Sequence, residues 1–279
     1  MSVKRRRQAG VMGWPVTHSK SPAVHGYWLN HYRIDGSYVR LPVEPAGLGG
    51  ALKSLAERGF AGVNLTVPHK EAALELVDEI SPEARRIGAV NTIFVSDDGR
   101  LHATNTDAYG FIANLKTGAP SFDLTSGPAV VLGAGGASRA VCVALQDAGI
   151  PEIRLINRTV SRAENLAESL GGNVKVTSWE EGITHLEDAA LLVNTTTLGM
   201  TGQPPLEIDI ARFASSGVVT DIVYAPIETP LLTAARARGL QTVDGLGMLL
   251  YQAQAGFEGW FGLKPDVTPA LRDHVLSAV

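Results

Sequence analysis

Short apolar runs alternate with amphipathic stretches along the whole chain of 279 residues. Runs rich in β-branched and apolar residues, bounded by glycine, proline or polar residues, predict strands. Stretches with apolar residues three or four positions apart predict helices. In the N-terminal part the predicted strands are 9–13, 37–41, 61–67 and 91–95, and the predicted helices lie near 22–33, 45–58 and 70–87.

The alternation resumes after a loop rich in glycine, proline and serine. A predicted helix of about ten residues follows Asp107 and leads into the loop 118–128, a plausible domain boundary. The pattern indicates an α/β protein whose second part holds a twisted, mostly parallel sheet. The strands predicted there are 129–132, 153–156, 174–176, 190–194, 218–222 and 241–243, and the chain from Asp244 onward is predicted to be helical.

A glycine-rich turn is the most informative feature of this second part. Glycines permit a tight turn and let backbone N–H groups approach a pyrophosphate at the start of the next helix. Ser138 stands where the usual dinucleotide fingerprint has Gly or Ala, and a turn that only connects strand to helix is the alternative. The apolar run 129–132 leads directly into the residues of the turn, Gly133, Ala134, Gly135, Gly136 and Ala137.

The residues after the next predicted strand indicate which dinucleotide binds. An acidic residue usually takes the ribose 2′-hydroxyl of NAD at this point. Here the chain instead carries Asn157, Arg158 and Thr159, with Arg162 one turn later. Guanidinium groups suit a 2′-phosphate, so the predicted cofactor is NADP. For Arg158 alone, a solvated surface charge is an equally good interpretation.

The composition of the chain limits the classes of molecule that it is expected to bind. With 45% hydrophobic and 19% charged residues the chain can bury a core large enough for two domains. A net charge of −4 argues against nucleic-acid binding, so small molecules are the expected partners. The single cysteine, Cys142, excludes an internal disulfide, and no histidine spacing indicates a metal site.

Targeting signals are not evident. The basic segment 4–7 is interpreted as a solvated tail, because glycines and Trp14-Pro15 interrupt the segment that follows. No stretch approaches the roughly 18 to 20 apolar residues of a membrane-spanning helix. We therefore expect a cytoplasmic protein that does not contact membranes.

Two polar segments of the N-terminal part lie where a strand ends and a helix begins. Ser19 and Ser21 precede a predicted helix and can hold a carboxylate, although Ser21 as a simple N-cap is the alternative. In the second segment, Asn64, Thr66 and Lys70 follow a strand, where parallel sheets place their ligands.

Lys70 is a candidate acid/base, with a plain surface lysine as the alternative. An ammonium beside a ketone stabilises and protonates the alkoxide that hydride transfer creates, and a carboxylate such as Asp107 can fix that ammonium. Asn91 also lies at the end of a strand-like segment, so several loops can supply polar groups for a hydroxylated substrate. Turn chemistry is the other interpretation of these residues.

The chain resembles the shikimate dehydrogenases over nearly its whole length. Seven segments in order carry the resemblance: HSKSP at 18–22, NLTVPHK at 64–70, GAVNT at 88–92, NTD at 105–107, GAGGASR at 133–139, NRTVSR at 157–162 and DGLGMLLYQA at 244–253. His69 and the segment 195–199 depart from the usual family pattern, but neither departure removes a catalytic group.

The resemblance implies a role for each matching residue. Lys70 and Asp107 would be the catalytic pair, and Ser19 and Ser21 would hold the substrate carboxylate with help from Tyr224. Thr66, Asn91, Asp107 and Gln252 would contact the ring oxygens of the substrate. Ile222 would line the nicotinamide pocket, and Gly245 would let the backbone approach the nicotinamide. Thr196 and Thr197 would lie beside the cofactor.

The resemblance also implies architecture and activity. Residues 1–107 with 244–279 would form an N-terminal α/β substrate domain, and 108–243 a Rossmann-type doubly wound NADP domain, with the active-site cleft between them. The reaction would be the reversible NADPH reduction of 3-dehydroshikimate to shikimate, by a monomer or homodimer. The alternatives are an NAD-dependent quinate/shikimate dehydrogenase and a catalytically silent NADP-sensing regulator. Arg158 and Arg162 argue against the first, and the presence of both Lys70 and Asp107 argues against the second.

Overall fold

A computed structural model describes residues 7–182 and 186–278 and divides the chain into two compact units. The first unit comprises Met1–Thr106 and Leu249–Val279, and the second comprises Asp107–Met248. Most of the basic segment 4–7 lies outside the described residues. Arg7, predicted to belong to a solvated tail, instead opens the first strand, and its Nη1 donates a hydrogen bond to the Trp260 carbonyl.

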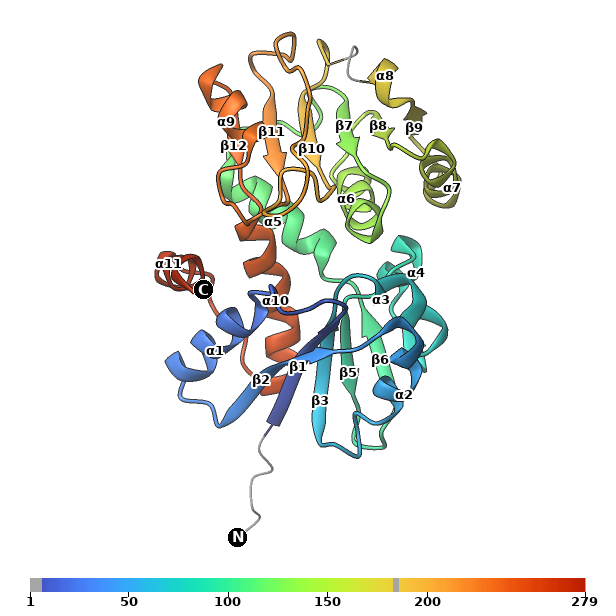
Figure 1. The fold of residues 1–279 in the computed structure, drawn as a ribbon, viewed down its shortest axis with the longest axis vertical. Coiled ribbons are helices and arrows are strands. Elements are labelled where there is room, and N and C mark those ends of the chain that lie inside the picture. Colours follow the sequence, from blue (N-terminus) through green and yellow to red (C-terminus); the bar gives the residue numbers. More distant parts are fainter. Residues whose placement is uncertain (1–6, 183–185, 279) are drawn as a thin grey trace. The chain divides into compact units, whose positions relative to one another are not determined.

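The first unit is built on a six-stranded mixed sheet in the order β2-β1-β3-β5-β6-β4 (Figure 1). Strands β1, β2 and β3 are parallel, β5 is antiparallel to both β3 and β6, and β4 is parallel to β6. The parallel part brings the C-terminal ends of β1 and β3 to one edge. The strands are β1 (Arg7–Gly13), β2 (Gly36–Pro42), β3 (Phe60–Leu65), β4 (Glu79–Ile80), β5 (Thr92–Val95) and β6 (Leu101–Thr104).

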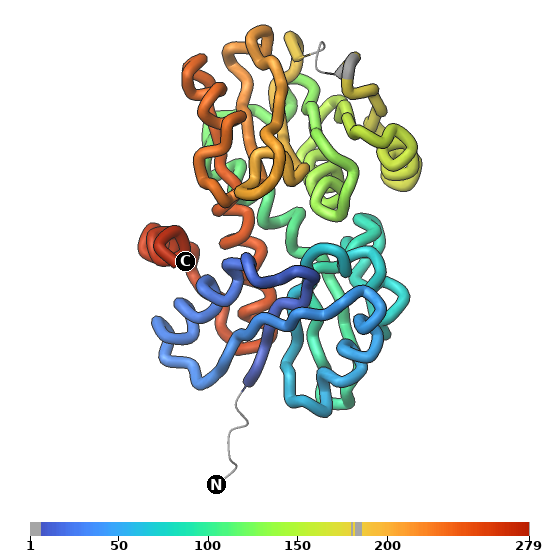
Figure 2. Tube along the Cα trace, in the orientation of Figure 1, coloured from blue at the N-terminus to red at the C-terminus, as the bar shows by residue number. Residues whose placement is uncertain are grey.

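Helices from both ends of the chain belong to this unit. Figure 2 shows the C-terminal helix α11, coloured red, beside the N-terminal helix α1, coloured blue. Lys20 fastens the two, because its ammonium donates to the carbonyls of Val275 and Ala278 at 3.1 and 2.9 Å. The α-helices are α1 (Ser21–His31), α2 (Leu48–Lys53), α3 (His69–Ala72), α4 (Pro82–Ile87), α10 (Leu246–Phe261, its residues from Leu249 onward) and α11 (Pro269–Ser277), with 3₁₀ turns η1 (Pro45–Gly47) and η2 (Ala73–Glu75).

The prediction of one helix over 70–87 is wrong. The chain there forms α3, η2, β4 and α4 in turn, and α4 starts afresh at Pro82 with Ser81 as its N-cap. Proline lacks an N–H and favours the first turn of a helix, so it ends the preceding element. Strand β6 was not predicted, and the helix expected over 45–58 ends at Lys53.

The second unit contains a six-stranded, entirely parallel sheet in the order β12-β11-β10-β7-β8-β9. This is the order of a dinucleotide-binding Rossmann fold, and it reverses direction between β7 and β10. The predicted α/β fold class is confirmed. The elements are α5 (Asp107–Gly118), β7 (Ala129–Leu132), α6 (Gly136–Asp147), β8 (Ile153–Ile156), α7 (Val160–Leu170), β9 (Val174–Thr177), α8 (Trp179–Gly182), β10 (Leu191–Asn194), β11 (Val218–Asp221), α9 (Pro230–Ala237) and β12 (Gln241–Val243).

The apolar runs that predicted these strands are buried on both faces. All four residues of β7, of β10 and of β11 are buried, as expected where helices cover both sides of a parallel sheet. Cys142 is part of this core, and burial raises the pKa of its thiol to about 12. Among the described residues no helix combines the length and apolar character needed to cross a membrane.

Candidate functional site

A buried polar cluster lies at the edge of the first unit's sheet, around Asn91. Its Nδ2 donates to Thr106 Oγ1 at 3.0 Å and to Gln252 Oε1 at 3.3 Å. Its Oδ1 accepts from the Thr106 main-chain N–H at 2.8 Å and from Thr92 Oγ1 at 3.0 Å. The structure therefore brings together two predicted substrate residues, Asn91 and Gln252, from segments 161 positions apart.

The cluster extends through Asn64 to Tyr38. Asn64 Nδ2 donates to the Asn91 carbonyl and to Thr92 Oγ1, and Tyr38 Oη donates to Asn64 Oδ1 at 2.6 Å. The imidazole of His25 stacks on the Tyr38 ring with centroids 3.9 Å apart. Complete burial lowers the pKa of His25 to about 3, so this imidazole is a neutral packing group.

The two candidate carboxylate-binding serines lie at the start of α1. Ser21 is the first helical residue and is buried, and its main-chain N–H donates to Ser19 Oγ at 3.3 Å. The residue before the helix, Lys20, makes no capping contact through its side chain. The simple alternative, an N-cap by the Ser21 hydroxyl, is wrong, because Ser21 lies inside the helix.

Lys70 lies on the short helix α3, directly after β3 and half-buried. Its carbonyl accepts from the Val90 N–H at 2.8 Å, which places its backbone beside the segment that carries Asn91. Asn91 in turn holds Thr106, and Asp107 follows Thr106 in the chain as the buried first residue of α5. Backbone and side-chain hydrogen bonds thus tie the Lys70 backbone to the segment that ends in Asp107.

His69, one of the departures from the family pattern, has a structural role. Its ring is buried, and Nε2 lies 2.8 Å from the Val43 carbonyl. Thr66 lies just beyond β3 and is half-buried, with its N–H donating to the Met12 carbonyl.

In the second unit the glycine turn lies between β7 and α6, at the C-terminal edge of the parallel sheet. Gly133 has φ +108°, and a Cβ there would lie 2.8 Å from Thr195 Oγ1, so glycine is required. A Cβ on Gly135 would meet nothing within 4 Å, which leaves the start of α6 accessible. Gly135 is also the N-cap of α6 and supplies no side-chain acceptor for the first N–H groups of that helix.

The predicted 2′-phosphate residues lie at the end of β8 and the start of α7. Arg158, Thr159 and Arg162 are exposed, and Asn157 Nδ2 donates to the Thr159 carbonyl at 2.8 Å. Among the ion pairs of the described residues none involves Arg158 or Arg162. Both guanidinium groups are therefore available to an anion at this edge.

A third group of polar contacts joins the ends of β10 and β11. Asn194 Nδ2 donates to Asp221 Oδ1 at 2.9 Å, and Thr229 Oγ1 donates to Asp221 Oδ2 at 2.8 Å. Burial raises the pKa of Asp221 to about 6 although Val223, Thr229 and Asn194 all donate to its carboxylate. Two predicted site residues, Ile222 and Tyr224, lie in the segment that these bonds hold.

Gly245 is required by packing against this same segment. A Cβ at Gly245 would lie 2.2 Å from the Ile222 carbonyl oxygen and 2.7 Å from that of Val223. The predicted reason for this glycine was a close approach of the nicotinamide, whereas the space that a side chain would fill is occupied by the chain's own backbone.

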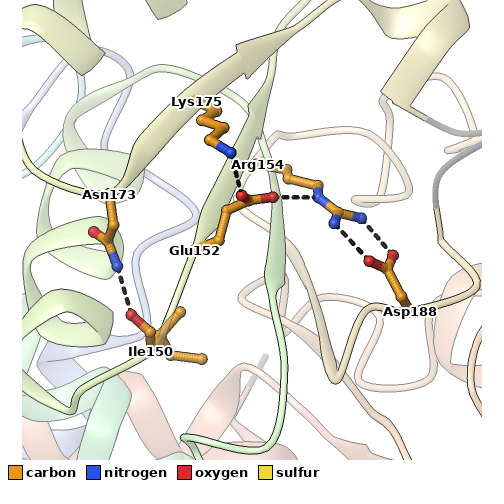
Figure 3. A network of polar contacts seen from close by, with 6 residues as sticks. All are labelled: Ile150, Glu152, Arg154, Asn173, Lys175 and Asp188. Carbon is orange, nitrogen blue, oxygen red and sulfur yellow. Dashed lines mark hydrogen bonds and ion pairs between the residues drawn. The ribbon is translucent and has the colours of Figure 1, made fainter.

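A network of charged side chains lies at the opposite ends of the strands in the second unit's sheet (Figure 3). Arg154 donates to both carboxylate oxygens of Asp188 at 2.6 and 2.7 Å, and its Nε donates to Glu152, which also pairs with Lys175. These residues lie at or next to the N-terminal ends of β8, β9 and β10, away from the glycine turn. No group of three or more metal-ligating side chains occurs among the residues that the structure describes.

Several residues of these clusters were not predicted from the sequence. Tyr38, Thr92 and Thr106 join the cluster around Asn91, and Asn194, Asp221 and Thr229 form the contact between β10 and β11. Thr106 had a signal, because it lies between two residues already singled out in the NTD segment. Tyr38 carried none.

Three family models match the chain. Residues 11–93 match the shikimate dehydrogenase substrate binding domain, residues 116–200 match shikimate / quinate 5-dehydrogenase, and residues 245–273 match the shikimate 5'-dehydrogenase C-terminal domain.

Proteins of known structure or curated name resemble the chain over almost its full length. The shikimate dehydrogenase (NADP(+)) of Paramagnetospirillum magneticum is 58% identical, with 98% of this chain and 99% of that protein covered. A crystal structure of the Thermus thermophilus shikimate 5-dehydrogenase with NADP(H) and shikimate has a TM-score of 0.85 and 42% identity, covering 96% and 98% of the two chains. The Corynebacterium glutamicum quinate dehydrogenase with NAD has a TM-score of 0.90 at 33% identity, covering 98% and 99%.

Proposed function

Because the chain belongs to the shikimate dehydrogenase family, we propose that it catalyses the reversible, NADP-dependent reduction of 3-dehydroshikimate to shikimate. The single observation that carries this proposal is the high identity to NADP-dependent shikimate dehydrogenases across the whole chain. The first unit is the proposed substrate domain and the second the proposed NADP domain. The cytoplasm is the proposed location, and the presence of only one cysteine supports it.

The second unit has the groups that an NADP molecule needs. The start of α6 is accessible beside Gly135, and its first N–H groups suit a pyrophosphate. Arg158 and Arg162 would hold the 2′-phosphate through charge-assisted hydrogen bonds. Bound NADPH supplies the hydride that reduces the ketone carbon of the substrate.

The cluster around Asn91 is the proposed site for the ring oxygens of the substrate. Asn91 and Gln252 come from different segments but are held in one arrangement by Thr106, which fits a site that must fix several hydroxyl groups. Thr66 would add a further polar contact. Ser19, Ser21 and Tyr224 are proposed to bind the carboxylate.

Lys70 and Asp107 are the proposed catalytic pair. During reduction the Lys70 ammonium donates a proton to the oxygen on C3, and during oxidation the neutral amine takes that proton back. Asp107 holds the ammonium in position and contacts a substrate hydroxyl. This role is supported by the family-type segments that carry both residues and by the hydrogen bonds that link their backbones through Asn91 and Thr106.

Turnover of shikimate with NADP⁺, followed by the absorbance of NADPH, tests the proposal. Wild-type protein should turn over, and Lys70→Ala should lower kcat by about 10² to 10⁴, the usual contribution of a general acid/base. Asp107→Asn should act similarly, and the double variant should be scarcely worse than the worse single one. Binding of NADPH, measured by fluorescence, should stay unchanged.

Lys53→Ala is the matched control, because Lys53 is an exposed lysine at the end of another short helix, α2. It should leave kcat unaltered. A Lys70→Ala enzyme with normal kcat would exclude Lys70, and a wild-type protein that binds NADPH without turnover would instead favour a cofactor-sensing regulator.

A further inference from the structure

The carboxylate of Asp221, at the end of β11, accepts hydrogen bonds from three other residues. The side chain is fully buried, and three donors converge on it. Oδ1 accepts from Asn194 Nδ2 at 2.9 Å and from the Val223 N–H at 3.0 Å, while Oδ2 accepts from Thr229 Oγ1 at 2.8 Å. Asp221 therefore joins the end of β10, the start of the segment after β11 and the start of α9.

The Asn194 side of the junction is fixed by hydrogen bonds that determine the orientation of its amide. Its Oδ1 accepts from the Thr196 main-chain N–H at 3.0 Å and from Thr196 Oγ1 at 2.7 Å. Its Nδ2 donates to the Leu198 carbonyl and to Asp221. Both donors and both acceptor positions of this amide are in use, so Asn194 offers Asp221 a rigid anchor.

The Thr229 side closes a loop. The bond between Thr229 and Asp221 spans eight residues, and the enclosed segment carries Ile222 and Tyr224. Thr229 is itself buried and also caps α9, because its Oγ1 accepts from the Leu232 N–H. Both ends of the segment 222–228 are thus held by one carboxylate.

A well-packed apolar side chain at this position would stabilise the fold at least as well as the buried carboxylate. Removing a charged group from water costs several kcal/mol, and a well-packed apolar replacement is often neutral or stabilising. A buried carboxylate whose hydrogen bonds hold the end of β10, the segment after β11 and the start of α9 is better explained by the arrangement of these segments than by stability.

We propose that Asp221 and Thr229 are positioning residues that hold Tyr224 where its hydroxyl meets the substrate carboxylate. The inference rests on the proposed function, because that function supplies the role of Tyr224. Neither Asp221 nor Thr229 contacts the substrate. Their contact sets the path of the loop, and Asn194 keeps Asp221 in place.

Thr229→Val tests this inference, because it keeps the size of the side chain and removes only the hydroxyl. The KM for shikimate should rise about tenfold, the effect of losing one hydrogen bond to a charged group, with kcat little changed. The KM for NADP⁺ should stay within about twofold, because the bonds from Asn194 and from the Val223 N–H to Asp221 still hold the end of the segment that carries Ile222. Thr229→Ser keeps the hydroxyl and should restore the wild-type KM.

Thr125→Val is a matched control. The Thr125 hydroxyl donates to Asp123 at 2.8 Å, the same distance as in the Thr229 contact, but in an exposed loop of the same unit. Its loss should change neither KM. If Thr229→Val does not fold, Thr229→Ala removes the same hydroxyl with less crowding and is measured in its place.

Combination with Tyr224→Phe separates this inference from the proposed function. If Thr229 acts through Tyr224, the double variant should have the KM of Tyr224→Phe alone. The positioning role would be overturned if the two substitutions multiplied each other's effect on the KM for shikimate. It would also be overturned if Tyr224→Phe raised that KM while Thr229→Val left it normal. If Tyr224→Phe itself leaves KM unchanged, the role proposed for Tyr224 fails, and this inference fails with it.

Discussion

The buried carboxylate of Asp221 should make the stability of the second unit depend on pH in a direction opposite to that of most carboxylates. Its pKa is raised by burial from 3.8 to about 6 in the folded chain. Between these values the folded state holds a proton that the unfolded state has released, so stability falls as pH rises. Above pH 6 the group is charged in both states, and the full cost of burying the charge is present.

The magnitude follows from the size of the shift. A difference of 3.8 to about 6 corresponds to about 3 kcal/mol at 1.36 kcal/mol per pKa unit. Asp221→Asn removes the titration but keeps the volume of the side chain. Because part of the titration lies below pH 4, the free energy of unfolding of the wild type relative to this variant should decrease by about 2 kcal/mol between pH 4 and pH 7. Contributions that do not titrate cancel in the change with pH.

Native-state hydrogen exchange of the buried strands β10 and β11 measures this quantity within the second unit alone. Comparing the two proteins at each pH removes the intrinsic pH dependence of exchange. The ratio of their protection factors should change by about fiftyfold across the window. A ratio that stays constant from pH 4 to pH 7, or one that moves in favour of the wild type as pH rises, would refute the reasoning.

Four further substitutions test the proposed cofactor and substrate contacts. Arg158→Ala should raise the KM for NADP⁺ about tenfold in steady-state kinetics and leave that for NAD⁺ nearly unchanged, because a charge-assisted bond is worth about 1.5 to 3 kcal/mol; equal losses for both cofactors would contradict the assignment. Ser19→Ala and Ser21→Ala should each raise the KM for shikimate several-fold without changing that for NADP⁺, and unaffected kinetics in both would place the carboxylate elsewhere. Gly245→Ala should lower the melting temperature and the affinity for NADPH together, because the new Cβ would lie 2.2 Å from the Ile222 carbonyl oxygen and must displace backbone; an unchanged melting temperature would show that the segment yields freely.

The sequence alone determined the local parts of this protein. The sequence predicted that the glycine turn follows one strand and the arginines the next, and the structure has β7 and β8 there. This was possible because turns and helix starts depend on neighbouring residues. The buried parallel strands of the second unit were found for the same reason, since an unbroken apolar run marks a strand covered on both faces. The family also followed from the sequence, because its motifs occur in order.

Only the tertiary structure decided which polar side chains meet. Strand β4 is two residues long and pairs with β6, and no local pattern distinguished it from part of a long helix over 70–87. Gln252 reaches Asn91 across 161 positions, and Asn194 reaches Asp221 across 27. Such contacts depend on the order and register of strands, which the packing of the whole unit fixes. A buried polar group is stable only with a partner, so the fold that supplies the partner decides what the residue does.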